Sequence, residues 1–144
     1  MISNAYANQI LNLICGVSDT LSLPGKLYLG LSASAPSASG AVNGEPSAAS
    51  YDRTIVGGSG TDEKKFGSAV AGVISNKSEI QFKTARTAWG TMNYFFLSES
   101  ETGAAILWGE LMNKDGTQGV TIGAETVPVF YEGDLKASLD VALD

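Results

Sequence analysis

The residue types that most often perform catalysis are scarce in this chain. It contains no histidine, the commonest general base and zinc ligand, and its single cysteine, Cys15, has no second cysteine for an intramolecular disulfide. Serine hydroxyls are numerous, but no Ser-x-x-Lys motif and no Gly-x-Ser-x-Gly elbow is present to activate one of them. The sequence therefore argues against most hydrolase and metalloenzyme mechanisms.

Three weaker patterns remain, and each has a simpler interpretation. Glu99 and Glu101 are the nearest pair of carboxylates, but they stand in a predicted polar turn where solvent would surround them. The glycine-rich segment 57–60 lacks the Gly-Lys-Ser/Thr ending of a phosphate loop, and the turn 113–117 lacks the repeated carboxylates of a calcium loop. We therefore expect no enzymatic activity, no cofactor and no metal.

Composition restricts the class of partner. The 144 residues, 44% of them hydrophobic, are enough for one domain with a single core. Fifteen acidic against nine basic side chains give a formal charge of −6, which argues against a nucleic-acid partner. No window reaches the roughly 20 apolar residues of a membrane-spanning helix, so we expect a soluble protein made in the cytoplasm.

The first 22 residues predict a helix and its connection. Ser3 and Asn4 are suitable N-cap residues, and Gly16 is a stop signal, so the helix is expected over residues 3–16. Its polar side carries Asn and Gln, so the apolar stripe must pack on this domain or on a neighbouring subunit. The stripe consists of Tyr6, Ile10, Leu13, Ile14 and Val17.

Residues 26–144 have the pattern of short strands between glycine-rich turns. The strongest run, 91–98, is apolar on both sides, which is typical of a strand inside a sandwich or beneath a subunit contact. Seven or eight strands behind one helix predict a mainly β fold, an antiparallel jelly-roll-like β-sandwich with one N-terminal amphipathic helix. The runs are 26–32, 51–56, 80–82, 91–98, 104–111, 120–122, 126–131 and 135–143.

A long Ser/Ala/Gly/Pro loop is expected over residues 32–50. Its small side chains offer little area to offset the entropy of ordering, so the sequence predicts that it is either mobile or held by a neighbouring chain. Its prolines, Pro36 and Pro46, and Tyr51 beyond it are candidate contact residues.

The order of short motifs along nearly the whole chain resembles a family of small structural proteins of tailed bacteriophage virions, described as tail-fibre-like or head-decoration-like. The motifs include the opening helix Ser3 to Leu11, Leu27 to Ser32, Glu45-Pro46-Ser47, Tyr51-Asp52-Arg53, Ile80-Gln81-Phe82, Trp89-Gly90-Thr91, Gly103 to Leu107, Gly123, Gly133-Asp134-Leu135 and Leu139-Asp140. The resemblance implies a virion component made in the host cytoplasm.

A capsid decoration or auxiliary protein is the preferred interpretation, because the chain has neither the repeats nor the heptads of a fibrous shaft. Three alternatives stay open: a tail or tail-fibre-associated protein, a carbohydrate-binding receptor module using the exposed aromatics among Tyr51, Trp89 and Trp108, and an enzyme. The expected partners are the major capsid protein or tail proteins, together with further copies in a dimer or trimer. The predicted interaction residues are Tyr6, Ile10, Leu13, Ile14, Pro36, Pro46 and Tyr51.

Overall fold

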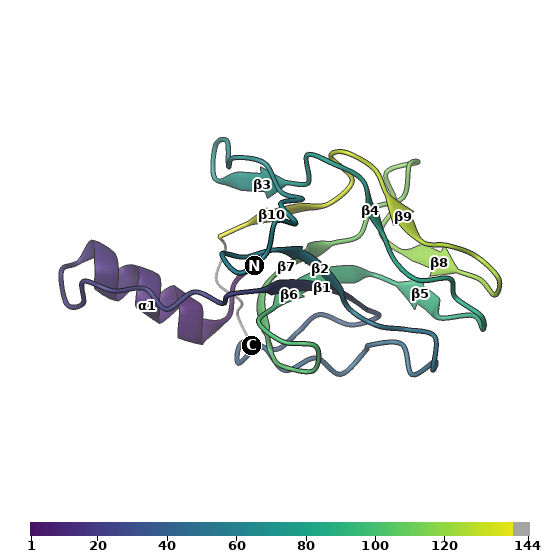
Figure 1. Ribbon diagram of the computed structural model, residues 1–144, viewed down its shortest axis with the longest axis horizontal. Coiled ribbons are helices and arrows are strands. Elements are labelled where there is room, and N and C mark those ends of the chain that lie inside the picture. The colour runs from purple at the N-terminus through teal and green to yellow at the C-terminus, as the bar shows by residue number, and fades with distance from the viewer. Residues whose placement is uncertain (140–144) are drawn as a thin grey trace.

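The computed structural model of the protein describes residues 1–139, and its fold is mainly β with one helix. In Figure 1 the helix α1 (Asn4–Ile14) projects from one end of a body made of short strands. The predicted mainly β, antiparallel class with one N-terminal helix is confirmed, because every strand pairing within these residues is antiparallel.

One four-stranded sheet forms the centre of the body, in the order β2-β1-β6-β7. The rest of the body contains three separate two-stranded sheets, β10-β3, β4-β9 and β5-β8. This arrangement is compatible with the expected sandwich, but the pairing does not itself define a second continuous sheet. The strands are β1 (Leu27–Ser32), β2 (Thr54–Gly57), β3 (Val73–Ser75), β4 (Ile80–Gln81), β5 (Gly90–Met92), β6 (Tyr94–Ser98), β7 (Ala105–Glu110), β8 (Val120–Ile122), β9 (Val129–Phe130) and β10 (Lys136–Ser138).

The run predicted as one strand over 91–98 is two strands, β5 and β6, separated at Asn93. The Asn93 backbone N–H donates to the Ser32 carbonyl at 3.0 Å, and its carbonyl accepts the Leu111 N–H at 2.9 Å. The break lets β5 leave the central sheet to pair with β8. Alternating hydrophobicity alone could not reveal it, because apolar residues continue on both sides of Asn93.

Both faces of β6 are covered by the chain itself. Phe95 and Leu97 belong to the main core, and Phe96 packs on the other face with Trp108, Ala38 and Ala105. The apolar character of both sides therefore reflects a central position in the body and leaves little of β6 for a subunit contact.

Two glycines make room for the two phenylalanines of β6. Gly30 of β1 is the register partner of Phe96, and a Cβ at Gly30 would lie 2.3 Å from the tip of that ring. Gly109 of β7 is the partner of Phe95, and a Cβ there would lie 2.3 Å from the Lys136 carbonyl oxygen and 2.8 Å from the ring. A side chain at either position would force the aromatic ring out of its place, so each Gly–Phe pair fixes the packing of one face.

The loop 32–50, predicted to be either mobile or held by a neighbouring chain, makes backbone hydrogen bonds within its own chain. The Ala33 N–H donates to the Gly44 carbonyl at 2.9 Å, and the Ala105 N–H donates to the Gly40 carbonyl at 2.7 Å. Pro36 and Ala38 are buried, the latter against Phe96 and Trp108. Backbone hydrogen bonds thus supply the ordering energy that the small side chains lack.

The C-terminal run is only partly within the described residues. Leu135 and Ala137 are buried and flank Lys136, as the alternation over 135–143 predicts, and β10 pairs with β3. Leu139 departs from the predicted pattern, because it lies just after β10 and is 59% exposed. The rest of the predicted strand, residues 140–144, lies outside the described residues.

Candidate functional site

The helix α1 begins one residue after the start of the predicted range 3–16 and ends two residues before its end, and its first turn has no side-chain capping bond from Ser3. Ser3 is the N-cap and Cys15 the C-cap. Gly16 adopts a positive φ of 73°, and the Val17 N–H donates back to the Asn12 carbonyl at 2.9 Å, which completes a Schellman motif. Cys15 is exposed, so it is not part of a packed interface within the chain.

Within residues 1–139, the base of α1 is the part of the helix that is attached to the body. Residues 1–3 pair with β7 through an isolated antiparallel Ile2–Leu107 bridge, and the Ser3 N–H donates to the Ile106 carbonyl at 2.8 Å. The Tyr6 hydroxyl donates to the Glu99 carboxylate at 3.0 Å, and Ala7 is the one residue of α1 that is buried. This attachment gives the helix a defined direction as it leaves the body (Figure 1).

Beyond its first turns α1 exposes its apolar side. Ile14 is 74% exposed and Leu11 56%, and Val17 just after the helix is 76% exposed. The connection back to β1 adds Leu23, while a bond from the Ser22 N–H to Gln9 holds that connection beside the helix at 3.0 Å. Large aliphatic side chains gathered in this way on a water-facing surface are typical of an interaction site.

We call this surface the α1 face and define it by Tyr6, Ile10, Leu11, Leu13, Ile14, Val17 and Leu23. At its base a small apolar hollow of about 120 Å³ lies between the helix and the body. The hollow is lined by Ile2, Ala7, Ile10, Leu11 and Leu139.

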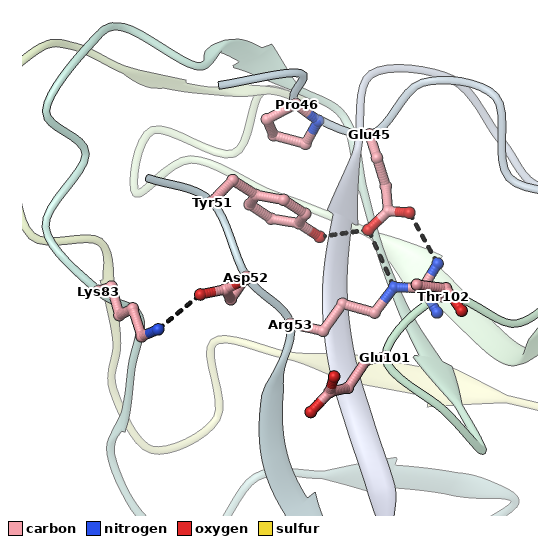
Figure 2. A pocket seen from close by; sticks show the side chains of 8 residues that line it. All are labelled: Glu45, Pro46, Tyr51, Asp52, Arg53, Lys83, Glu101 and Thr102. Carbon is pink, nitrogen blue, oxygen red and sulfur yellow. Dashed lines mark hydrogen bonds and ion pairs between the residues drawn. The ribbon is translucent and has the colours of Figure 1, made fainter. Parts of the chain in front are cut away.

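A second concave region is a polar cleft of about 560 Å³ on the body (Figure 2). Its charged groups are largely paired with one another, since Lys83 bonds to Asp52 and Arg53 to Glu45. The cleft is lined by Glu45, Pro46, Tyr51, Asp52, Arg53, Lys83, Glu101 and Thr102.

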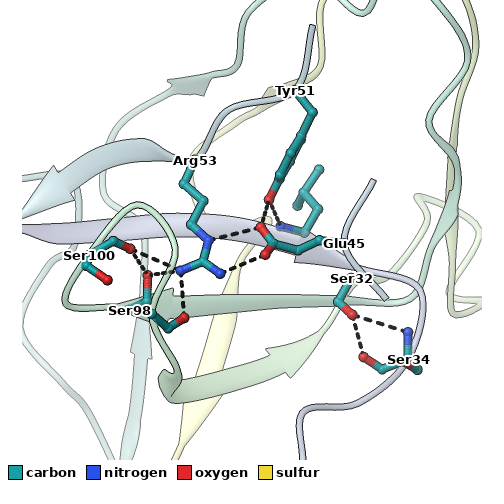
Figure 3. Close-up of polar contacts among 9 residues, drawn as sticks. Ser32, Ser34, Glu45, Tyr51, Arg53, Ser98 and Ser100 are labelled. Atoms are coloured by element: carbon teal, nitrogen blue, oxygen red, sulfur yellow. Dashed lines mark hydrogen bonds and ion pairs between the residues drawn. The ribbon is translucent and has the colours of Figure 1, made fainter. Parts of the chain in front are cut away.

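The floor of the cleft is a structural network centred on Arg53 (Figure 3). The guanidinium holds Glu45 in a two-pronged ion pair at 2.7 and 2.9 Å, and it donates to Ser98 Oγ and the carbonyls of Ser100 and Gly103 at 2.8 to 3.0 Å. The side chain is 2% exposed. Arg53 thereby joins the loop 32–50 to the turn after β6, and its donors are used within the chain.

Tyr51 belongs to the same network. Its hydroxyl donates to Glu45 at 2.7 Å and accepts the Leu31 N–H at 3.0 Å. Burial, followed by the bond to Glu45, raises the pKa of Tyr51 well above the usual range. The ring packs edge-on against Trp89 with centroids 5.1 Å apart. Tyr51 is thus a packed structural residue more than an exposed contact.

The candidate catalytic carboxylates do not form a paired site. Glu99 accepts the hydroxyl of Tyr6, whereas Glu101 faces the polar cleft. Within residues 1–139, no group of three or more His, Cys, Asp or Glu side chains is placed to hold a metal ion. The segment 57–60 consists of the last residue of β2 and the turn that follows it, and 113–117 is a turn in which Asp115 bonds Thr117.

The predicted interaction residues fall into two groups that the structure does not bring together. Tyr6, Ile10, Leu13 and Ile14 all lie on the α1 face. Pro46 and Tyr51 line the polar cleft, and Pro36 is buried in the loop. Two strongly exposed residues, Leu11 and Leu23, are not among the predicted interaction residues. The helical spacing of Leu11 from Ala7 and Ile14, and the position of Leu23 in the turn segment before Pro24, are the sequence signals that could have indicated them.

Comparison with known proteins gives one family. The model of the Gp80 family, described as podophage GP4 fiber I protein gp80, matches residues 1–138. The chain belongs to the Gp80 family. A search of curated proteins finds no match.

Membership of the Gp80 family confirms the resemblance to phage virion structural proteins and implies a location in the virion. The family's description as a fiber protein fits the tail-fibre alternative better than the preferred interpretation as a capsid decoration protein. No helix in residues 1–139 is long and apolar enough to cross a membrane.

Proposed function

We propose that this Gp80-family protein is a non-catalytic subunit of a fibre on a short-tailed phage particle, joined to other virion proteins through the α1 face. The observation that carries the proposal is a helix that is attached at its base yet leaves Leu11, Ile14 and Val17 in water. Exposing this much aliphatic surface is unfavourable, so a protein partner is the natural cover in an assembled particle.

The absence of fibrous repeats from the chain does not count against this role. A fibre can be built from compact subunits if each carries a joint, and α1 projects from the body as such a joint (Figure 1). Repeats and heptads are needed in a shaft formed by one continuous chain, which is a different way of building a fibre.

The polar cleft supports a structural role. Arg53 and Glu45 are committed to each other and to the turn after β6, so neither is available to act on a substrate. The receptor-module alternative has less support, because Trp89 and Trp108 are 6% and 1% exposed and Tyr51 is packed against neighbouring rings. An aromatic platform for a sugar needs an accessible ring face.

The test uses phage particles that carry altered versions of the protein. An epitope inserted in the exposed turn 113–117 locates the protein by electron microscopy, and mass spectrometry counts copies per particle. We expect label on a tail appendage, loss of the Ile14→Asp protein from particles and retention of Asn12→Asp, which adds the same charge on the polar side of α1. Label spread over the capsid surface, or full retention of Ile14→Asp, would contradict the proposal.

A further inference from the structure

We infer that the body carries a second contact site, a trough between β2 and β4 that binds an extended segment of a different virion protein with lysine or arginine side chains. The segment pairs through its backbone with the strand edges that border the trough, as an added β-strand does. This inference rests on the proposed place of the chain in a fibre, and it assigns a contact apart from the α1 face.

Two adjoining hollows form the trough. One is the polar cleft, and the other, of about 570 Å³, lies between Thr54 and Ile55 of β2 and Ile80 and Gln81 of β4. Arg53 and Glu101 line both hollows, so the two meet at these side chains. Figure 2 shows Glu101 beside Arg53 at this junction. Each hollow has the volume of a typical ligand pocket, roughly 300 to 1,000 Å³.

The wall formed by β2 directs backbone groups into the trough at Thr54. The Val56 carbonyl accepts the Lys65 N–H at 2.9 Å, so the backbone groups of Val56 point to the side of β2 away from β1. Backbone groups alternate in direction along a strand, and Thr54, two residues before Val56, therefore points to the same side. Among the described residues β2 is an edge strand of the central sheet, and an edge of this kind can accept a further strand.

The opposite wall has the same property at Gln81. The Phe82 N–H donates to the Pro128 carbonyl at 2.9 Å, on the side where β4 pairs with β9. Gln81 precedes Phe82, so its own N–H and carbonyl point away from β9. The trough is thus bordered by strand edges on two sides, which suits an extended polypeptide.

Charge determines the kind of segment that fits. Arg53, Lys65 and Lys83 line the trough, and each forms an ion pair with a carboxylate that lines it too, at 2.7, 3.4 and 2.5 Å. Glu79 and Glu101 also line the trough, and within residues 1–139 neither forms an ion pair. The excess of negative charge attracts a cationic segment and repels an acidic one.

A polypeptide suits the trough better than a sugar chain does. Tyr51 is the aromatic residue that lines it, and its ring packs against Phe82 and Trp89 with centroids 6.4 and 5.1 Å away. A sugar ring stacks on an accessible aromatic face, which Tyr51 does not offer. Backbone pairing with Thr54 and Gln81 needs no such platform.

Amide chemical shifts in NMR spectra of the purified full chain test the site. The probe is the capped peptide acetyl-Lys-Val-Lys-Val-Lys-Val-amide, and we expect it to shift the Thr54 and Gln81 amide signals, with saturation on the order of 1 mM. The same peptide with Glu in place of Lys should not bind. A Lys peptide methylated at alternate backbone nitrogens should bind at least about fivefold more weakly, because it lacks the donors for strand pairing.

Variants of the protein test the role of charge. Glu79→Gln combined with Glu101→Gln should weaken binding of the Lys peptide about threefold or more, whereas Glu132→Gln, the same change at an exposed position outside the trough, should have little effect. All three side chains are exposed, so the variants should keep the dispersion of the wild-type spectrum.

Several outcomes would overturn the inference. They are shifts confined to other surfaces, equal binding of the Glu peptide or the methylated peptide, and equal weakening by Glu132→Gln. A glucosamine hexamer is cationic but has no peptide backbone, and binding of this sugar as tight as that of the Lys peptide would assign the trough to a glycan instead. Absence of peptide binding together with loss of Ile14→Asp from particles would refute the trough but leave the fibre role intact. Peptide binding together with label spread over the capsid would do the reverse.

Discussion

The strongest prediction concerns Arg53, because several parts of the body meet at its guanidinium. Replacing Arg53 with Met keeps the aliphatic volume but removes the two bonds to Glu45 and the bonds to Ser98, Ser100 and Gly103. Removing one partner of a buried ion pair costs about 3–5 kcal/mol, since the other charge stays desolvated. Glu45 is 25% exposed and regains some water, so we expect a loss near the lower end, about 3 kcal/mol.

Equilibrium urea unfolding, followed by the fluorescence of the buried residues Trp89 and Trp108, measures this loss. For a chain of this length, about 3 kcal/mol corresponds to a decrease of roughly 10 °C in the melting temperature. A double-mutant cycle with Glu45→Gln should show the two changes to be non-additive, because both break the same ion pair.

The Lys83–Asp52 pair, whose side chains are 72% and 60% exposed, supplies the control. Lys83→Met should unfold within the fitting error of the wild type, because an exposed ion pair is screened by solvent. A loss below about 1 kcal/mol for Arg53→Met, or additive effects with Glu45→Gln, would refute the conclusion that this network holds the loop to the sheet.

Three further predictions test the packing, the titration and the loop. Gly30→Ala should destabilise the fold by about 1–3 kcal/mol through collision with Phe96, measured by urea unfolding, whereas Gly123→Ala, with open space around its Cβ position, should not. Partial burial and then the bond to a neighbouring carboxylate raise the pKa of Tyr6 to about 12, so its contribution to stability is complete below pH ~10 and is lost as the pH rises through about 12. Unfolding measured at increasing alkaline pH should show a smaller decrease for Tyr6→Phe than for wild type. Hydrogen exchange should show protected amides in the loop 32–50 of the monomer, and uniformly fast exchange there would contradict its attachment to its own chain.

Sequence patterns predicted structure well where the conformation depends on a few neighbouring residues. The turn 113–117 has an Asp115 that bonds Thr117, and the hairpin between β6 and β7 turns at the polar segment 99–103. Trp89 and Trp108, named as candidate aromatics of a receptor module, are both buried. Turn propensity and alternation are properties of a few neighbouring residues, so they are legible in one sequence.

Sequence patterns did not predict the contacts between residues that lie far apart in the chain. Nothing near Arg53 in the sequence shows that its guanidinium reaches Ser98 and Gly103, and nothing in the loop 32–50 shows that Gly40 bonds Ala105. The Gly30–Phe96 pair depends on a register between β1 and β6 that the sequence does not reveal. These contacts join residues 45 or more positions apart, which local periodicity cannot detect.

The sequence pattern of residues 3–16 correctly predicts a helix, but the same pattern does not determine what the helix packs against. An amphipathic stripe requires a cover, but a stripe packed on its own domain and a stripe reserved for a neighbour have the same spacing. The distinguishing signal is the composition around it: eighteen residues without a charged side chain in a chain of formal charge −6. A helix on the surface of a monomer usually carries charges on its solvent side, and α1 carries Asn and Gln there instead. The uncharged composition of α1 therefore agrees with the proposed protein partner at the α1 face, because a charged side chain buried in such a contact would cost several kcal/mol.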